Sequence, residues 1–285
     1  MPFLLVHNPS SGSGAGDLTT RAQQELNDVR SLKLAPGVDL GREIGVALDE
    51  GRTIVACGGD GTVNAVAQHV AGTGGSMAVL PGGTLNHFAR DLGVDDTDIA
   101  FAALAHGNAA RIDVGRAGER VFVNNVGFGI YPEVVREREQ GEHRLGRWLS
   151  LATSVARVAI SFDALEGRIA ADSRVRELQA TAVFVGNNRF STSPGSIGRR
   201  QVLDEGLLDV RVVRARVGLL GRASAGWRAA VSRPRRVVQA VAREVEVRLR
   251  EPRLMAVDGE QDREHRSVRI RIEPGALRIL VPPAG

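Results

Sequence analysis

The sequence has little lysine and few aromatic residues, and both shortages exclude classes of protein. Lys33 is its single lysine, and the other 36 of its 37 basic residues are arginine. P-loop NTPases and protein kinases hold the nucleotide phosphates with a lysine, and Lys33 lies in no such motif, so both classes are excluded. Aromatic residues make up 4% of the chain and no nucleic-acid-binding motif occurs, so we expect no nucleic-acid partner.

Cysteine and long apolar runs are also scarce. Cys57 is the one cysteine, so no internal disulfide can form. Its position within a strand-like run predicts a small buried side chain rather than a reactive thiol. No apolar run reaches the ~18–20 residues that span a bilayer, and the N-terminus shows no signal-peptide pattern. The expected location is therefore cytoplasmic.

What the chain does contain is an alternation of strand-like and helix-like segments. Its 285 residues, 43% of them hydrophobic, suffice for one large or two medium domains. Up to residue 110, short apolar runs alternate with helical patterns, which predicts a doubly wound α/β domain with a parallel sheet. The predicted strands there include residues 3–6, 53–57 and 77–80, and the predicted helices include 19–29, 39–48 and 63–70.

After residue 110 the pattern changes to alternating apolar and charged residues. Segments such as 208–213 and 244–249 alternate in this way, which is typical of antiparallel strands with one face in water. We therefore predict two domains. Residues 1–110 form the α/β nucleotide-binding domain, and residues 111–285 form a β-rich, sandwich-like domain that holds the substrate.

Three loops rich in glycine, serine, threonine and asparagine follow three predicted parallel strands, at residues 7–16, 58–62 and 81–86. The carboxyl ends of parallel strands meet at one sheet edge, where α/β proteins bind ligands. Gly58-Gly59-Asp60-Gly61-Thr62 lies between a strand and a helix, the geometry that presents main-chain N–H groups to a phosphate. Asp60 adds a carboxylate that can hold a phosphate-bound Mg²⁺. The sequence thus predicts a phosphate-binding edge.

Five segments occur in an order that resembles one known family. They read Asn8-Pro9-Ser10-Ser11-Gly12, Gly58-Gly59-Asp60-Gly61-Thr62-Val63-Asn64, Pro81-Gly82-Gly83-Thr84-Leu85-Asn86, Leu203-Asp204-Glu205-Gly206-Leu207-Leu208-Asp209-Val210 and Val257-Asp258-Gly259-Glu260. Together they span nearly the whole chain and resemble the motifs of the diacylglycerol kinase catalytic domain family, which includes bacterial diacylglycerol kinases and sphingosine kinases. The Gly58–Thr62 turn alone is less specific, because NAD kinases and phosphofructokinases carry similar turns.

The resemblance implies ATP and Mg²⁺ as cofactors and an active site in the cleft between the two domains. Asp60 would serve the nucleotide, Mg²⁺ and the chemistry. Glu260, with Asp258 beside it, would be the general base on the lipid hydroxyl, because phosphoryl transfer needs a carboxylate to accept that proton. Without the resemblance, Asp258–Glu260 would be interpreted as a hairpin turn. The residues implied to hold ATP are Asn8, Ser10, Ser11, Gly12, Gly58, Gly59, Gly61, Thr62, Gly83, Thr84 and Asn86.

The resemblance also implies a structural Mg²⁺ near Asp204, with Asp113 joining its network. The residues alone fit a simple turn before a strand equally well. Three departures from the family pattern concern the metal and the substrate. Ala65 stands where the family often has Glu, Tyr131 stands where some members have an acidic residue, and residues 189–200 lack the common Gly-Gly stretch. The identity of the lipid headgroup therefore stays open.

Residues 211–253 are strongly basic, with 12 arginines, three glutamates and a net charge of +9. Such a stretch fits either a solvated face or the binding of an anionic surface, and we expect an anionic membrane surface. It includes a helical pattern over 217–231 with Trp227 on its apolar side, which fits packing on a sheet or lying at a membrane interface. We therefore expect peripheral association with the inner face of the cell membrane, and a homodimer is the candidate assembly.

These observations predict ATP-dependent phosphorylation of a hydroxyl group on a membrane lipid, diacylglycerol-like by resemblance. Two alternatives stay open. An NAD kinase-like enzyme would share the glycine-rich turn, although the Pro81–Asn86 and Asp258–Glu260 motifs fit the lipid family better. A non-catalytic lipid- or nucleotide-binding protein is favoured by the departures at Ala65 and Tyr131, and its intact acidic residues argue against it.

Overall fold

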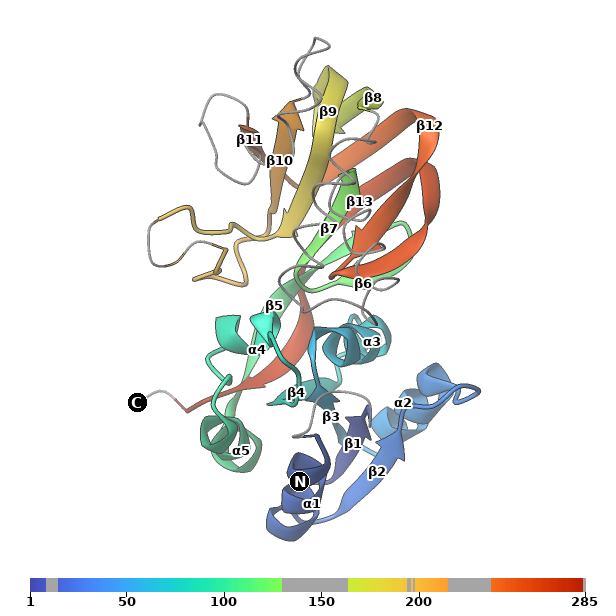
Figure 1. The fold of residues 1–285 in the computed structure, drawn as a ribbon. Helices are drawn as coiled ribbons and strands as arrows, with labels where there is room; N and C mark the ends of the chain where they lie inside the picture. Colours follow the sequence, from blue (N-terminus) through green and yellow to red (C-terminus); the bar gives the residue numbers. More distant parts are fainter. Residues whose placement is uncertain (9–14, 130–163, 194–195, 197, 215–236, 284–285) are drawn as a thin grey trace, which may run out of the picture. The chain divides into compact units, whose positions relative to one another are not determined.

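The chain forms two units, and neither is continuous in the sequence (Figure 1). The computed structural model describes residues 1–8, 15–129, 164–193, 196, 198–214 and 237–283. Unit 1 comprises Met1–Asn124, Asn187–Gly206 and Glu273–Gly285, and unit 2 comprises Asn125–Gly186 and Leu207–Ile272.

Unit 1 contains a parallel sheet whose strands follow the order β2-β1-β3-β4, with the last part of β13 beside β4. The hydrophobic side chains of β1 and β3 are almost fully buried, as their short apolar runs predict. β5 pairs with β13 and with the short β6. The strands are β1 (Phe3–His7), β2 (Val29–Lys33), β3 (Thr53–Gly58), β4 (Ser76–Pro81), β5 (Asn108–Ala117), β6 (Arg120–Phe122) and β13 (Glu260–Val281).

Among the described residues, five helices accompany this sheet, and an aspartate caps the N-terminus of two of them. Asp39 accepts a hydrogen bond from the N–H of Arg42, and Asp96 accepts from Asp98 and Ile99, so each satisfies N–H groups that the first helical turn leaves free. The described helices are α1 (Ala15–Glu25), α2 (Leu40–Asp49), α3 (Asp60–Val70), α4 (His87–Asp91) and α5 (Thr97–His106).

The prediction of a helix over residues 19–29 is wrong at its C-terminal end. α1 ends at Glu25 and β2 begins at Val29. Asp28, with φ of 54°, adopts the left-handed conformation that stops a helix, and its carbonyl accepts a hydrogen bond from the N–H of Phe3. Aspartate tolerates this conformation better than most residues, which is why the apolar pattern alone gave no sign of the break.

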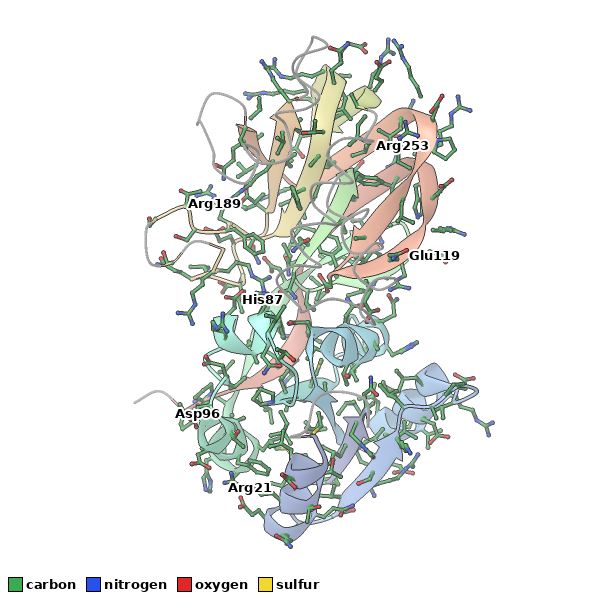
Figure 2. All side chains as sticks on the ribbon, in the orientation of Figure 1. Arg21, His87, Asp96, Glu119, Arg189 and Arg253 are labelled. Carbon is green, nitrogen blue, oxygen red and sulfur yellow. The ribbon has the colours of Figure 1, made fainter. Side chains whose placement is uncertain are left out.

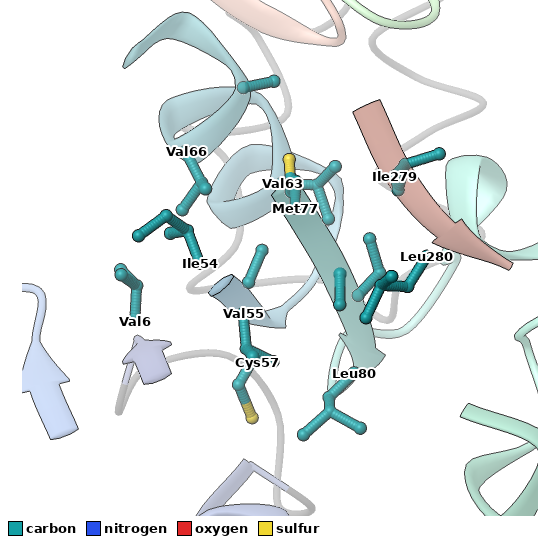
Figure 3. Close-up of a cluster of buried hydrophobic side chains, with 14 of the residues drawn as sticks. Val6, Ile54, Val55, Cys57, Val63, Val66, Met77, Leu80, Ile279 and Leu280 are labelled. Atoms are coloured by element: carbon teal, nitrogen blue, oxygen red, sulfur yellow. The ribbon is translucent and has the colours of Figure 1, made fainter. Parts of the chain in front are cut away.

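The core of unit 1 is formed by side chains from its strands and from the helices that cover them, and Figure 3 shows part of it. Val63 and Val66 of α3 pack onto Ile54 and Val55 of β3, among side chains of β1, β4 and β13. Cys57 is fully buried there, and burial raises the pKa of its thiol to about 11, while a hydrogen bond with Thr19 opposes the shift. The prediction of a small buried side chain at Cys57 is confirmed.

Unit 2 is built from antiparallel strands. The long β9 and β12 each pair with both β7 and β8, so these four strands close into a ring. β13 continues from β12 through a tight turn, and β11 pairs with β10. The strands are β7 (Asn125–Gly129), β8 (Leu165–Ala171), β9 (Arg174–Asn187), β10 (Leu208–Arg214), β11 (Val237–Ala242) and β12 (Glu244–Val257).

The predicted fold class, an α/β domain followed by a β-rich sandwich-like domain, is confirmed. In β12 the buried Val245, Val247 and Leu249 alternate with charged residues, the pattern expected of a strand with one wet face. The predicted helix over 217–231 lies outside the described residues.

The predicted boundary at residue 110 falls inside β5, which belongs wholly to unit 1. Two later segments, 187–206 and 273–285, also return to unit 1. Residues 273–285 belong to unit 1 because Arg278 and Ile279 pair with Ser76 and Met77 and so extend the parallel sheet. The two compact units are therefore interleaved in the sequence.

Candidate active site

Asp60 joins two of the three predicted loops. It is the first residue of α3, directly after β3, and its carboxylate reaches the first residues of α4. Oδ2 accepts a hydrogen bond of 3.1 Å from the N–H of His87, which Figure 2 labels, and Oδ1 accepts one of 3.0 Å from the N–H of Phe88. Both bonds place the negative charge at a helix N-terminus, where it is stabilised. The structure therefore brings the 58–62 and 81–86 loops together.

The two loops also touch through glycine backbones. A Cβ added to Gly83 would lie 2.4 Å from the Cα of Gly59, and the N–H of Gly82 donates to the carbonyl of Gly58 at 3.0 Å. Contacts this close leave no space for a side chain. The glycines at 59 and 83 therefore let the two main chains lie against each other.

Asn86 shapes the third loop from within. Its Oδ1 accepts a hydrogen bond of 3.0 Å from the N–H of Gly83, and its Nδ2 donates to the Gly83 carbonyl at 2.8 Å. Its φ of 47° is left-handed, a conformation that asparagine tolerates. The amide of Asn86 thus holds the turn that leads into α4, while Thr84 and Leu85 are exposed.

Thr62 carries a buried hydroxyl with no hydrogen-bond partner in the structure. It lies in the first turn of α3, two residues after Asp60, and a Cβ on Gly58 would meet its Oγ1 at 2.4 Å. Most buried polar atoms in proteins are paired, so this unpaired hydroxyl beside the loop is unusual. The glycine at position 58 leaves room for this threonine side chain.

The first loop begins at the same sheet edge. His7, the last residue of β1, is in register with Cys57, and Gly58 is in register with Pro81, so Asn8 follows β1 at the end where the other two loops start. Burial and, secondarily, the positive charge of Lys33 lower the pKa of His7 below its usual 6.5, so this imidazole is neutral at pH 7. Ser10, Ser11 and Gly12 lie outside the described residues.

The glycine contact gives a prediction for Gly83→Ala. The new methyl group must push the loop away from Gly59, because the atom that it meets is backbone. We expect a loss of about 1–3 kcal/mol in the free energy of unfolding and a clear loss of ATP binding. Denaturant unfolding and calorimetric titration measure the two effects. Gly45→Ala is the matched control, because a Cβ there meets nothing within 4 Å. Normal ATP binding by Gly83→Ala would contradict the interpretation.

Asp258 and Glu260, both in unit 2, have different environments. Asp258 and Gly259 form the turn between β12 and β13, with φ values of 49° and 85°. The buried Asp258 carboxylate accepts a hydrogen bond of 2.8 Å from the N–H of Asn125, and the Asp258 N–H donates to the Asn125 carbonyl at 2.8 Å. Glu260 is exposed at the start of β13. Asp258 therefore fastens the turn to β7 and leaves Glu260 as the accessible carboxylate.

Asp113 binds main-chain N–H groups from two distant segments of unit 1. It is 1% exposed, and its oxygens accept hydrogen bonds of 2.7 Å from Gly206 and 2.9 Å from Gly275. Asp204, by contrast, is exposed. Within the described ranges, no group of three or more histidine, cysteine or acidic side chains is arranged to hold a metal. The contacts of Asp113 are those of a structural carboxylate, and the Mg²⁺ near Asp204 stays a prediction.

The chain is similar to known proteins over nearly its whole length. Residues 2–117 match the family model described as the diacylglycerol kinase catalytic domain, and residues 124–281 match the YegS C-terminal NAD kinase beta sandwich-like domain. A Pseudomonas aeruginosa protein named "Probable lipid kinase YegS-like" is 31% identical, over 98% of this chain and 94% of its own. A Xanthomonas oryzae protein with the same name is 30% identical, over 86% of this chain and 84% of its own.

Solved structures agree on the fold. A diacylglycerol kinase from Bacillus anthracis superposes with a TM-score of 0.73 at 22% identity, covering 99% of this chain and 97% of the other. A nucleotide-type α/β unit with a β-sandwich-like unit, and glycine loops gathered around an aspartate, define a kinase of the diacylglycerol kinase catalytic-domain class. Within that class, the chain belongs to the family of YegS-like lipid kinases.

Proposed function

We propose that this protein transfers the γ-phosphate of ATP to a hydroxyl group of a membrane lipid, with a diacylglycerol-like acceptor. The observation that carries the proposal is the contact between the Gly58–Thr62 and Gly83–Asn86 loops, held by the Asp60 carboxylate. Close glycine backbones and the start of α3 suit the phosphates of a nucleotide. Because the chain has no lysine in these loops, main-chain N–H groups carry more of the phosphate binding.

The proposed chemistry assigns one task to each carboxylate. Glu260 accepts the proton of the lipid hydroxyl as its oxygen forms a bond to the γ-phosphorus, and the bond to the β–γ bridging oxygen breaks to leave ADP. Asp60 would hold Mg²⁺, because carboxylate oxygens suit this hard cation. Bound Mg²⁺ would neutralise phosphate charge. Asp258 positions the turn from which Glu260 projects.

Phosphate transfer from labelled ATP tests the proposal directly. The purified protein would be incubated with mixed micelles of diacylglycerol, monoacylglycerol, phosphatidylglycerol or a sphingoid base, and separately with NAD. We expect label in at least one lipid and none in NAD. Label in NAD alone would establish the NAD kinase alternative. Residues 124–281 match a domain described as NAD kinase beta sandwich-like, so this alternative is tested in the same assay.

The non-catalytic alternative rests on two departures from the family pattern. Ala65 lies on α3, five residues after Asp60, and Tyr131 lies outside the described residues. If the wild type and Asp60→Asn were equally inactive on the whole lipid panel while ATP still bound, the protein would be a binding protein. A difference between them would favour the kinase.

We also propose that the basic stretch, residues 211–253, binds an anionic membrane. The ion pairs of its described arginines indicate which part of the stretch would make the contact. Arg248, Arg250 and Arg253 each pair with a carboxylate, at 2.7, 2.8 and 3.3 Å, so much of their charge is already neutralised. Arg211 pairs with Asp209 at 2.7 Å. Six further arginines of the stretch, Arg216, Arg222, Arg228, Arg233, Arg235 and Arg236, lie outside the described residues, where no acidic residue accompanies them.

A second observation points to the same part of the chain. β11 follows these arginines directly, and its Val237, Val238 and Val241 are exposed. Apolar side chains that follow a run of arginines in the sequence suit a lipid headgroup region, where both kinds of contact are favourable. Among the described helices, none is long and apolar enough to cross a membrane.

Vesicle binding should therefore need anionic lipid and weaken with salt. We expect sedimentation with phosphatidylglycerol vesicles at low salt, loss of binding towards 1 M salt, where the Debye length falls to about 3 Å, and no binding to phosphatidylcholine. Serine at Arg233, Arg235 and Arg236 should abolish it. Serine at the paired Arg248, Arg250 and Arg253 is the matched control and should weaken it less. Salt-independent binding to neutral vesicles would refute the electrostatic proposal.

A further inference from the structure

Arg200 is a fully buried arginine whose guanidinium group is surrounded by oxygen acceptors. Its side chain is 0% exposed, and Nε donates to Oδ2 of Asp91 at 2.7 Å. Nη2 donates to Oδ1 of Asn124 at 2.7 Å, and Nη1 donates to the carbonyls of Asn187, at 3.2 Å, and Val123. A buried charge is costly unless it is paired and hydrogen-bonded, so this ordered set of acceptors indicates a specific role.

Two of the acceptors lie where the chain passes from one unit to the other. Asn124 is the last residue of the first unit 1 segment, and Asn187 is the first residue of the second. They also bond each other directly, because the N–H of Asn187 donates to the Asn124 carbonyl at 2.9 Å. Arg200 therefore fixes, within unit 1, the ends of the segments that lead to β7 and from β9.

Asp91, the carboxylate partner of Arg200, connects it to the candidate nucleotide loops. Asp91 is the last residue of α4, and its second oxygen accepts the main-chain N–H of Arg200 at 3.2 Å. The guanidinium carbon lies 5.9 Å from the ring of Phe88 in the same helix and 5.1 Å from that of Phe190. α4 is only about 7.5 Å long, so its two ends move together. Arg200 holds one end, and the Asp60 carboxylate binds the other.

We propose that Arg200 is a positioning residue for the nucleotide site, acting through α4 on Asp60 and on the Gly83–Asn86 loop. The inference rests on the proposed function, because it assigns the nucleotide to these loops. Lysine cannot replace Arg200 in this role. It keeps the positive charge but offers a single nitrogen, which cannot reach acceptors placed around a planar fork. Arg200→Lys should therefore hold α4 less firmly, and the α4 N–H groups that bond to Asp60 should be less protected from hydrogen exchange.

The experiment compares wild type, Arg200→Lys and Arg116→Lys. Arg116 is a matched control, because it forms a two-point pair with Glu273 at 2.8 and 3.0 Å in the same unit and its bonds do not involve α4. Hydrogen exchange without ligand is read on peptides that cover residues 83–92, and ATP affinity is read by calorimetric titration. We expect faster exchange there and about tenfold weaker ATP binding in Arg200→Lys, with neither change in the control.

Each outcome decides a separate point. Unchanged exchange, or faster exchange with unchanged ATP affinity, overturns the positioning role and leaves the proposed function standing. Absence of ATP binding in the wild type overturns the proposed function and, with it, the assignment of these loops to a nucleotide. If Arg200→Lys does not fold, Asp91→Asn removes the same link from the α4 side and should give the same pair of changes.

Discussion

Asp60→Asn is expected to lower the rate of lipid phosphorylation by at least about a hundredfold. The carboxylate accepts two N–H groups at the start of α4, one on each oxygen. An amide has a single oxygen, so its NH₂ group would face one of these donors, and the charge that suits Mg²⁺ would be lost. The rate constant kcat is measured with labelled ATP and the best lipid of the panel, and thermal unfolding is recorded beside it.

Asp39→Asn is the matched control for this variant. Asp39 also caps a helix in unit 1 and accepts one N–H, from Arg42 at 3.0 Å, but this bond joins the cap to its own helix, α2. The activity of Asp39→Asn should stay within about twofold of the wild type, because asparagine stabilises a helix N-terminus nearly as well as aspartate. Equal losses in both variants would show that Asp60 matters only through stability.

Glu260→Gln should lower kcat by about 10²–10⁴-fold and leave the fold unchanged. A glutamine cannot accept the proton of the lipid hydroxyl, so the transfer step loses its base. Glu260 is exposed, and the change removes no burial, so the unfolding temperature should stay the same. ATP affinity should also persist, which calorimetric titration of the variant would check.

Two further variants, on the same strand and its turn, are compared with Glu260→Gln. Glu264→Gln changes an equally exposed glutamate of β13 and should leave kcat unaltered. Asp258→Asn should instead lower stability, because the buried carboxylate fastens the turn to the N–H of Asn125. A Glu260→Gln variant with normal kcat would remove Glu260 from the mechanism, and the search for the base would then move to other groups of unit 2.

The sequence could predict where the loops gather but not how they are joined. Strand and helix patterns place the starts of all three loops at the carboxyl ends of β1, β3 and β4, and the register of His7 with Cys57 and of Gly58 with Pro81 agrees. The bonds from Asp60 to α4 depend on the distance between two helix starts, which no periodic pattern encodes. The sequence therefore suggested a metal and phosphate role for Asp60 and missed its structural one.

Contacts across long stretches of sequence were also beyond prediction. Arg200 is one of 36 arginines, and nothing in its neighbours marks it as buried. Asp113 bonds residues 93 and 162 positions further along the chain, and local patterns do not report such distances. Residues 189–200, where the sequence departs from the family pattern, lie within a segment that belongs to unit 1.

The return of β13 to the first sheet has a consequence for synthesis of the chain. β4 gains its second neighbour only when Arg278 and Ile279 arrive, more than 190 residues after Ser76. Until then, one edge of a hydrophobic parallel sheet is open, and the Asp113 carboxylate lacks its Gly275 donor. A ribosome-bound chain must therefore keep its first unit incomplete until Arg278 and Ile279 have emerged, so the first hundred residues alone do not complete unit 1.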